Sequence, residues 1–240
     1  MSWSTTQVSG KSVDVFVPGE DLKPAGIVLF LHGYDGVTIK DNPAYSNELA
    51  KHNLIGLSPL GEHCWWTDVV YPSYDPLTSP LDYLSEHIPK YCAERWQIEP
   101  PRIGVCGVEM GGQGALQLAY RHARKFPAVV AISPKIDFET WWGHGTSLDT
   151  LFENAEAARQ RTAILHLHPL NYPRRQLLLC DPADPYCFDG VLTLASKLSS
   201  TGIAFEDDFV TTHGGYGWNY ANAMAPKVID FLARAVAEAR

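Results

Sequence analysis

The chain has 240 residues, of which 45% are hydrophobic and 19% are charged, and its formal net charge is −8 at pH 7. This length suits one domain with a sizeable core, and we expect that domain to span residues 1–240. The acidic balance, without any cluster of lysine and arginine, argues against nucleic acid and anionic membranes as partners.

Short β-like runs alternate with helical patterns along the chain. This alternation predicts an α/β fold, with a mostly parallel twisted sheet covered by helices on both faces. The strands are expected at residues 13–17, 27–31, 55–58, 103–107, 128–132, 176–180 and 204–209. The helices are expected at residues 45–52, 81–96, 110–122, 148–159, 190–200 and 222–239. Residues 137–173 break the rhythm and are expected to form either a small lid over the carboxyl edge of the sheet or an ordinary helical crossover.

The ends and cysteines of the chain indicate its compartment. Residues 1–7 lack the basic and apolar stretches of a signal peptide, and the longest apolar run, residues 27–31, is far below the ~20 residues of a membrane span. Five irregularly spaced cysteines are typical of reduced thiols. We therefore expect a cytoplasmic protein with a small-molecule substrate or ligand, and no cofactor; the sequence sets no oligomeric state.

The segment Gly107-Val108-Glu109-Met110-Gly111 has the form of a nucleophile elbow. It follows an apolar strand-like run and opens into a helical one, which is where Gly-x-Ser-x-Gly presents a serine above an α/β-hydrolase sheet. The glycines permit the sharp turn and the close approach of strand and helix. The residue at the tip here is Glu109, so the pattern indicates the fold more directly than the reaction.

Two further segments fit the same pattern. Residues 31–36, Leu-His-Gly-Tyr-Asp-Gly, resemble the loop whose backbone N–H completes an oxyanion hole, here at Tyr34, with Met110 supplying the partner N–H. His32 is expected to pack beneath that loop as a structural residue. After the strand at 176–180, Asp184 matches the acid that orients the catalytic base, with Asp181 as the weaker candidate; an Asp beside Pro in a plain turn is the alternative for either.

The last motif is Thr212-His213-Gly214-Gly215-Tyr216-Gly217-Trp218-Asn219-Tyr220. Together with residues 32–36 and the elbow, it resembles the esterase branch of the α/β-hydrolases, relatives of esterase D and S-formylglutathione hydrolase. The resemblance covers nearly the whole chain in the expected order, and it implies a single α/β-hydrolase domain of ester- or thioester-hydrolase ancestry. In that family a serine stands at the elbow tip and a histidine follows the Gly-Gly pair.

The resemblance therefore implies that Glu109 replaces the nucleophile and Tyr216 replaces the base, while Asp184 remains. An acyl-enzyme route needs an activated hydroxyl and an imidazole, so serine-esterase activity is expected to be nearly absent, with residual carboxylic ester hydrolysis as an alternative. His213 lies three residues from the expected position and is a weak substitute base.

Three hypotheses account for Glu109. In the first, Glu109 takes part in catalysis: it resembles the nucleophilic aspartate of haloalkane dehalogenases and epoxide hydrolases, but those enzymes also need a histidine. The expected reaction is therefore general-base catalysis by Glu109, with Tyr216 as a hydrogen-bond donor. The alternative is a catalytically silent relative in which Glu109 itself fills the oxyanion hole and the cavity binds a ligand or partner. Both replacements could also be engineered, or reflect drift after loss of function.

Aromatic residues near the motifs are expected to wall the pocket. These are Trp65, Trp66, Trp141, Trp142 and Trp218, with Cys64 and His213 beside them. No metal site is expected, because His166 and His168 share a strand-like face but lack a third ligand nearby.

Overall fold

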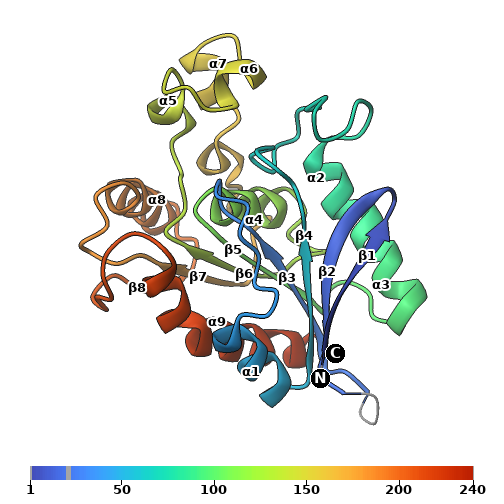
Figure 1. Cartoon of the computed structure of the whole chain (residues 1–240). Helices are drawn as coiled ribbons and strands as arrows, with labels where there is room; N and C mark the ends of the chain where they lie inside the picture. The colour runs from blue at the N-terminus through green and yellow to red at the C-terminus, as the bar shows by residue number, and fades with distance from the viewer. Residues whose placement is uncertain (1, 20–22, 240) are drawn as a thin grey trace.

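An eight-stranded sheet organises the chain in the computed structural model, which describes residues 2–19 and 23–239 (Figure 1). The strand order is β1-β2-β4-β3-β5-β6-β7-β8, and the strands from β3 onward run parallel. The strands are β1 (Ser2–Val8), β2 (Lys11–Val17), β3 (Gly26–Leu31), β4 (Leu54–Pro59), β5 (Ile103–Val108), β6 (Ala128–Ile132), β7 (Arg175–Leu179) and β8 (Glu206–Asp208). This is an α/β-hydrolase architecture, as the sequence predicts.

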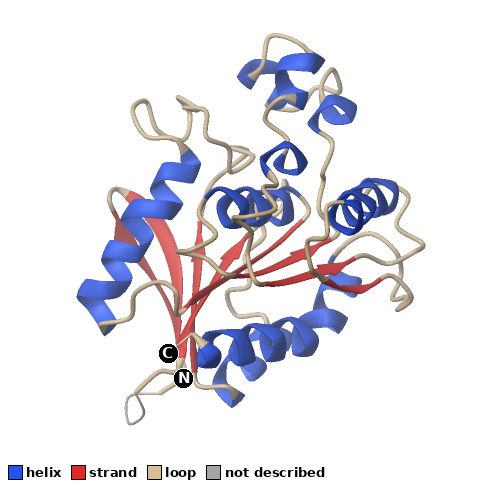
Figure 2. Ribbon diagram, turned by 180° about the vertical axis from the view of Figure 1, so that it is seen from behind, coloured by secondary structure: helices blue, strands red, loops and turns tan. Residues whose placement is uncertain are grey.

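Helices cover both faces of the sheet (Figure 2). The helices are α1 (Pro43–Lys51), α2 (Pro80–Asp82), the π-helical turn η1 (Tyr83–His87), α3 (Ile88–Trp96), α4 (Met110–Arg121), α5 (Phe138–Trp141), α6 (Leu148–Leu151), α7 (Ala155–Arg159), the 3₁₀ turn η2 (Ala163–His166), α8 (Phe188–Ser200) and α9 (Trp218–Glu238). Helices α1 and α9 pack on one face, and α3, α4 and α8 pack on the other. None of the helices in the described ranges is long and apolar enough to cross a membrane.

The alternation of side chains along β3 explains the two layers. Ile27, Leu29 and Leu31 belong to the core under α3, α4 and α8, whereas Val28 and Phe30 belong to the core under α9. Successive side chains of a strand point to opposite faces, so an uninterrupted apolar run is buried on both sides. All five cysteines are free and buried, and burial raises the pKa of the Cys106 thiol, as expected for a core residue.

Three elements differ from the sequence predictions. Strand β1 was not expected, because its sequence Ser-Trp-Ser-Thr-Thr-Gln-Val is polar; it forms an edge hairpin with β2 and is half exposed. The predicted strand at 204–209 is reduced to Glu206–Asp208. The predicted helix at 148–159 is divided into α6 and α7, since the Asn154 side chain accepts the Ala157 N–H and caps a new helix.

Residues 137–173 form a cluster of short helices, α5, α6, α7 and η2, between β6 and β7. In Figure 1 the helices α5–α7 stand together beyond the sheet, on the side of the loops that follow the strands. The segment is therefore a helical cap beside the carboxyl edge, and neither continues a regular β–α rhythm nor forms one crossover helix.

Candidate functional site

Glu109 stands at the sharp junction between β5 and α4. Its backbone has φ 55° and ψ −114°, a conformation that non-glycine residues rarely adopt. The turn is tight enough that a Cβ on Gly107 would collide with the carbonyl of Gly111, and a Cβ on Gly111 would collide with that of Leu31. The elbow geometry expected from the two glycines is thus present, and it presents Glu109 at the carboxyl edge of the sheet.

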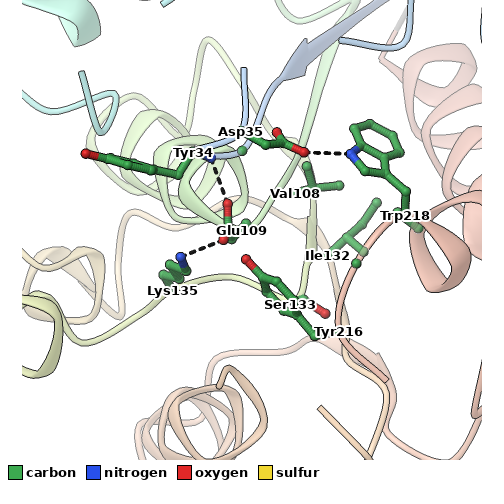
Figure 3. Close-up of a pocket in the computed structure, with 12 residues that line it drawn as sticks. Tyr34, Asp35, Val108, Glu109, Ile132, Ser133, Lys135, Tyr216 and Trp218 are labelled. Carbon is green, nitrogen blue, oxygen red and sulfur yellow. Dashed lines mark hydrogen bonds and ion pairs between the residues drawn. The ribbon is translucent and has the colours of Figure 1, made fainter. Parts of the chain in front are cut away.

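Both oxygens of the Glu109 carboxylate are engaged by donors (Figure 3). Oε2 accepts the backbone N–H of Tyr34 at 2.7 Å, and Oε1 lies 2.5 Å from Nζ of Lys135. The side chains of Glu109 and Lys135 are only 12% and 9% exposed, so the ion pair is largely withdrawn from solvent. The Glu109 carboxylate is thus held between a backbone N–H and an ammonium, which is the geometry of a charge-assisted contact.

A cavity of about 330 Å³ opens beside this pair. Its walls are mainly apolar and aromatic, and its charged groups are Asp35, Glu109 and Lys135. In Figure 3 these side chains surround one space, with Glu109 and Lys135 on one side and Trp218 on the other. The apolar and aromatic lining comes from Tyr34, Val108, Ile132, Tyr216, Trp218 and Ala221. A few polar groups converging on an apolar cavity of this volume is the usual composition of a small-molecule site.

Lys135 is the residue of this site that the sequence analysis missed. It follows β6 by three residues, and β6 pairs with β5, so it reaches the same sheet edge as Glu109. Its ammonium lies 4.0 Å from the ring centroid of Trp141, 5.9 Å from that of Tyr216 and 6.0 Å from that of Trp65. The sequence carried one signal for this role: Lys135 is a single lysine that comes three residues after β6, and β6 is the neighbour of the strand that leads into the elbow.

Tyr216 lines the cavity from the loop before α9 and is 39% exposed. Its ring packs edge-on against Tyr186 at 5.1 Å between centroids. The loop is anchored by Asp181, whose Oδ2 accepts the N–H groups of His213 at 2.5 Å and Gly215 at 2.8 Å. The structure thus places Tyr216 beside the same cavity as Glu109.

Asp184 is buried and faces the turn before α8. Its Oδ1 accepts the backbone N–H groups of Tyr186 at 2.9 Å and Cys187 at 3.0 Å, and the Cys180 thiol points to its Oδ2 at 3.8 Å. Within residues 2–19 and 23–239 no hydrogen bond joins Asp184 to Tyr216. The carboxylate that holds the Tyr216 loop is Asp181, the weaker of the two candidates.

Three of the expected wall residues lie in the core instead of lining the cavity. Cys64, Trp65 and Trp66 are fully buried, and this corrects their assignment to the pocket. The Trp65 indole donates to Ser147, and the Trp66 indole donates to the His32 carbonyl. The Trp65 ring lies 5.7 Å from the Tyr34 ring and the Trp66 ring lies 5.2 Å from the His32 ring, so both pack against the loop of residues 32–36.

The remaining expected wall residues divide into two groups. Trp218 lines the cavity, whereas Trp141 lies outside the cavity lining, which corrects its assignment, and covers the Lys135 ammonium. Trp142 instead donates its indole N–H to the Phe152 carbonyl within the helical cap, and His213 is exposed outside the cavity lining. These two positions are corrected: neither is part of the cavity wall.

The two residues expected to supply oxyanion-hole N–H groups, Tyr34 and Met110, lie next to Glu109. Tyr34 directs its N–H into the site, and Met110 is the first residue of α4, where helix amides have no intrahelical acceptor. His32 lies beneath the loop, with Nδ1 2.7 Å from the Gly33 carbonyl and Nε2 accepting the Gly61 N–H at 2.8 Å. Burial lowers the pKa of His32, so its neutral ring has a structural role, as expected. In the described part of the chain no three His, Cys, Asp or Glu side chains are grouped as a metal site requires.

We expect Asp181→Asn to destabilise the Tyr216 loop. Burial would raise the pKa of Asp181, but the backbone N–H bonds from His213, Ala183 and Gly215 lower it, and the net shift is downward. A lowered pKa contributes stability that is present above the unfolded value of ~3.9 and is lost as the pH falls through the folded value. The variant should lose about 2 kcal/mol of unfolding free energy at pH 7, measured by urea denaturation.

The matched control for this change is Asp207→Asn, an exposed carboxylate on β8. It should leave the unfolding free energy within about 0.5 kcal/mol. The difference between Asp181→Asn and the parent chain should shrink progressively below about pH 4. A difference that stayed constant down to pH 2 would contradict the assigned role of the Asp181 charge.

Comparison with known proteins agrees with this architecture. The sequence model of the family Esterase, described as Putative esterase, matches residues 16–179. The chain is similar in structure to FphF, a fluorophosphonate-binding serine hydrolase of Staphylococcus aureus, with a TM-score of 0.80 and 15% identity over 97% of this chain and 99% of that one. It is also similar to an S-formylglutathione hydrolase (FrmB) of Staphylococcus aureus, with a TM-score of 0.74 and 15% identity over 97% and 98% of the two chains.

A third similar structure is MPT51 (FbpC1) of Mycobacterium tuberculosis, with a TM-score of 0.75 and 16% identity over 97% of this chain and 99% of that one. No curated protein matches the chain in sequence. The structural likenesses at this identity concern the fold, whereas the sequence model covers well over half of the chain. The chain belongs to the esterase family of the α/β-hydrolases.

Proposed function

We propose that the chain binds a small organic molecule in the cavity beside Glu109, and that it does not hydrolyse esters through a serine acyl-enzyme. In this proposal Glu109 stands where the family carries its serine nucleophile, and Tyr216 stands where it carries histidine. A carboxylate held by two donors is not an alkoxide nucleophile, and a phenol does not take up and return a proton as an imidazole does. The cavity remains, so ligand binding is the function that it retains.

The observation that carries the proposal is the 2.7 Å hydrogen bond from the Tyr34 N–H to Glu109 Oε2. A backbone N–H of this loop is the donor that an esterase offers to the oxyanion of its tetrahedral intermediate. The tethered carboxylate of Glu109 accepts that N–H here, and Lys135 balances its charge from the other side. The anion site is then filled by the protein's own side chain.

General-base catalysis by Glu109 is the second candidate. One observation favours it: the carboxylate and the Lys135 ammonium both line the cavity. Glu109 would accept the proton of a carbon acid, and the electron pair released onto a substrate oxygen would be stabilised by Lys135. However, both oxygens of the Glu109 carboxylate already accept hydrogen bonds, so a substrate proton would have to compete with the Tyr34 N–H or the Lys135 ammonium for one of them. We therefore place binding first and base catalysis second, the reverse of the order expected from the sequence.

The deciding assay uses p-nitrophenyl acetate and a benzisoxazole, with the chain and with Glu109→Gln. We expect no burst of p-nitrophenol and no acylated protein by mass spectrometry. Benzisoxazole ring opening that disappears in Glu109→Gln would promote the second candidate above the first. One equivalent of p-nitrophenol released in a burst, with an acyl group retained on the chain, would overturn the proposal.

A second prediction concerns Glu109→Ala, which vacates the anion site. The Tyr34 N–H and the Lys135 ammonium would then face an empty position, so free acetate should occupy it. At ten times its dissociation constant a ligand stabilises the fold by about 1.4 kcal/mol, so acetate should raise the melting temperature of the variant by several degrees. Acetamide at the same concentration is the uncharged control, and the parent chain should respond to neither. An equal response of parent and variant to acetate would contradict the filled anion site.

A further inference from the structure

We infer that the ligand of this cavity is an organic ammonium ion with an aromatic or apolar body. This inference rests on the proposed binding function and names its ligand class. Three charged side chains line the cavity, namely Asp35, Glu109 and Lys135. Glu109 and Lys135 neutralise each other at 2.5 Å, so Asp35 leaves the cavity with one net negative charge.

The carboxylates of Glu109 and Asp35 both lie next to Gly33. Glu109 Oε2 lies 2.7 Å, and Asp35 Oδ1 lies 3.4 Å, from the point where a Cβ on Gly33 would stand. These oxygens are therefore separated by no more than the sum of the two distances, 6.1 Å. An ammonium group bound to Asp35 therefore has a second carboxylate oxygen within 6.1 Å of the oxygen that binds it. The absence of a side chain at Gly33 keeps the space between them open.

The carboxylate of Asp35 is fixed in direction at the mouth of the cavity. Its Oδ2 accepts the indole N–H of Trp218 at 2.8 Å (Figure 3). Its Oδ1 accepts the N–H of Val37 at 3.0 Å. Across residues 2–19 and 23–239 no ion pair engages Asp35. Its charge is therefore oriented but not compensated, and a ligand can supply the missing cation.

The aromatic walls are suited to a cation as well. Tyr34, Tyr216 and Trp218 line the cavity, and aromatic faces attract ammonium groups within about 6 Å of their centroids. The site already holds one cation in this way, since the Lys135 ammonium lies 4.0 Å from the Trp141 ring. A carboxylate ligand, in contrast, would meet two carboxylates and one ammonium that is already paired. The net charge of −8 also favours the approach of cations over anions.

The test compares three ligands of similar size and different charge: phenethylamine, 2-phenylethanol and 3-phenylpropanoate. Binding is measured by isothermal titration calorimetry at neutral pH and low salt, and by the change in tryptophan fluorescence of the chain. We expect phenethylamine to bind at least tenfold more tightly than the alcohol, and the propanoate to bind more weakly than both. Asp35→Asn should reduce the preference for the amine about tenfold, which corresponds to about 1.4 kcal/mol.

Asp230→Asn is the matched control, because it removes one exposed carboxylate from α9 outside the cavity lining. It should leave the preference for the amine unchanged. Equal binding of amine and alcohol, or tighter binding of the propanoate, would overturn the ammonium inference and leave the binding function standing. Failure of all three ligands to bind would overturn both.

Discussion

We expect the double variant Glu109→Ser/Tyr216→His to hydrolyse p-nitrophenyl acetate at least about 100-fold faster than the parent chain. Removing the nucleophile or the base of a catalytic triad alone costs several orders of magnitude in turnover, and this chain is proposed to lack both. Supplying both together should therefore recover a measurable part of that loss. The single variants should gain little, because the two groups act as a unit.

The geometry of the chain supports this recovery. Glu109 and Tyr216 line the same cavity, so a hydroxyl and an imidazole at these positions would face one space. The Tyr34 N–H, released from Glu109, would again be free for an oxyanion. The Gly215 N–H bonds to Asp181 at 2.8 Å, which keeps position 216 against the turn that carries Asp184.

Two measurements distinguish acyl-enzyme catalysis from general hydrolysis. The double variant should show a burst of p-nitrophenol and an acyl adduct at position 109 by peptide mapping. Glu109→Ser/Tyr216→Phe is the matched control, since it supplies the hydroxyl without the base, and it should remain near the parent rate. Equal rates for these two double variants would refute the proposed equivalence of Tyr216 with the family's histidine.

The elbow and its neighbours could be predicted because local backbone geometry is encoded locally. Gly107 and Gly111 must be glycine where strand and helix approach so closely, and the sequence around them reports that requirement directly. The apolar runs of the parallel strands and the periodic face of α9 are local patterns of the same kind. Their positions therefore followed from the residues alone.

The aromatic wall and the partner of Glu109 could not be predicted in the same way. Trp65 and Trp66 are near the motifs in sequence, but the chain turns them into the core beneath the loop instead of into the cavity. Lys135 is 26 residues from Glu109 and meets it only because β5 and β6 pair in parallel. Such contacts depend on strand order and side-chain direction, which no local pattern specifies.

We expect Lys135→Met to lower the free energy of unfolding by about 3 kcal/mol, which is typical when one partner of a buried ion pair is removed. The variant would leave the Glu109 carboxylate, 12% exposed, with the Tyr34 N–H and without its counter-charge. The replacement by Met also removes the ammonium from the face of Trp141, at a further cost of about 0.5–1 kcal/mol. Urea denaturation at pH 7 measures the change.

The double variant Glu109→Gln/Lys135→Met measures the interaction between the two side chains apart from the contribution of each one alone. Because it removes both charges, it should recover most of the lost stability and give a coupling free energy of about 2 kcal/mol in a double-mutant cycle. The matched control is the Lys125–Glu86 pair, whose charged atoms lie 2.8 Å apart, against 2.5 Å for Lys135–Glu109, but whose side chains are 44% and 63% exposed. Lys125→Met should cost less than about 1 kcal/mol because solvent screens an exposed pair. Lys135→Met could also lower the free energy of unfolding by no more than Lys125→Met does. In that case water would replace Lys135 as the partner of the Glu109 carboxylate, and the carboxylate would be accessible enough to serve as the base of the second candidate function.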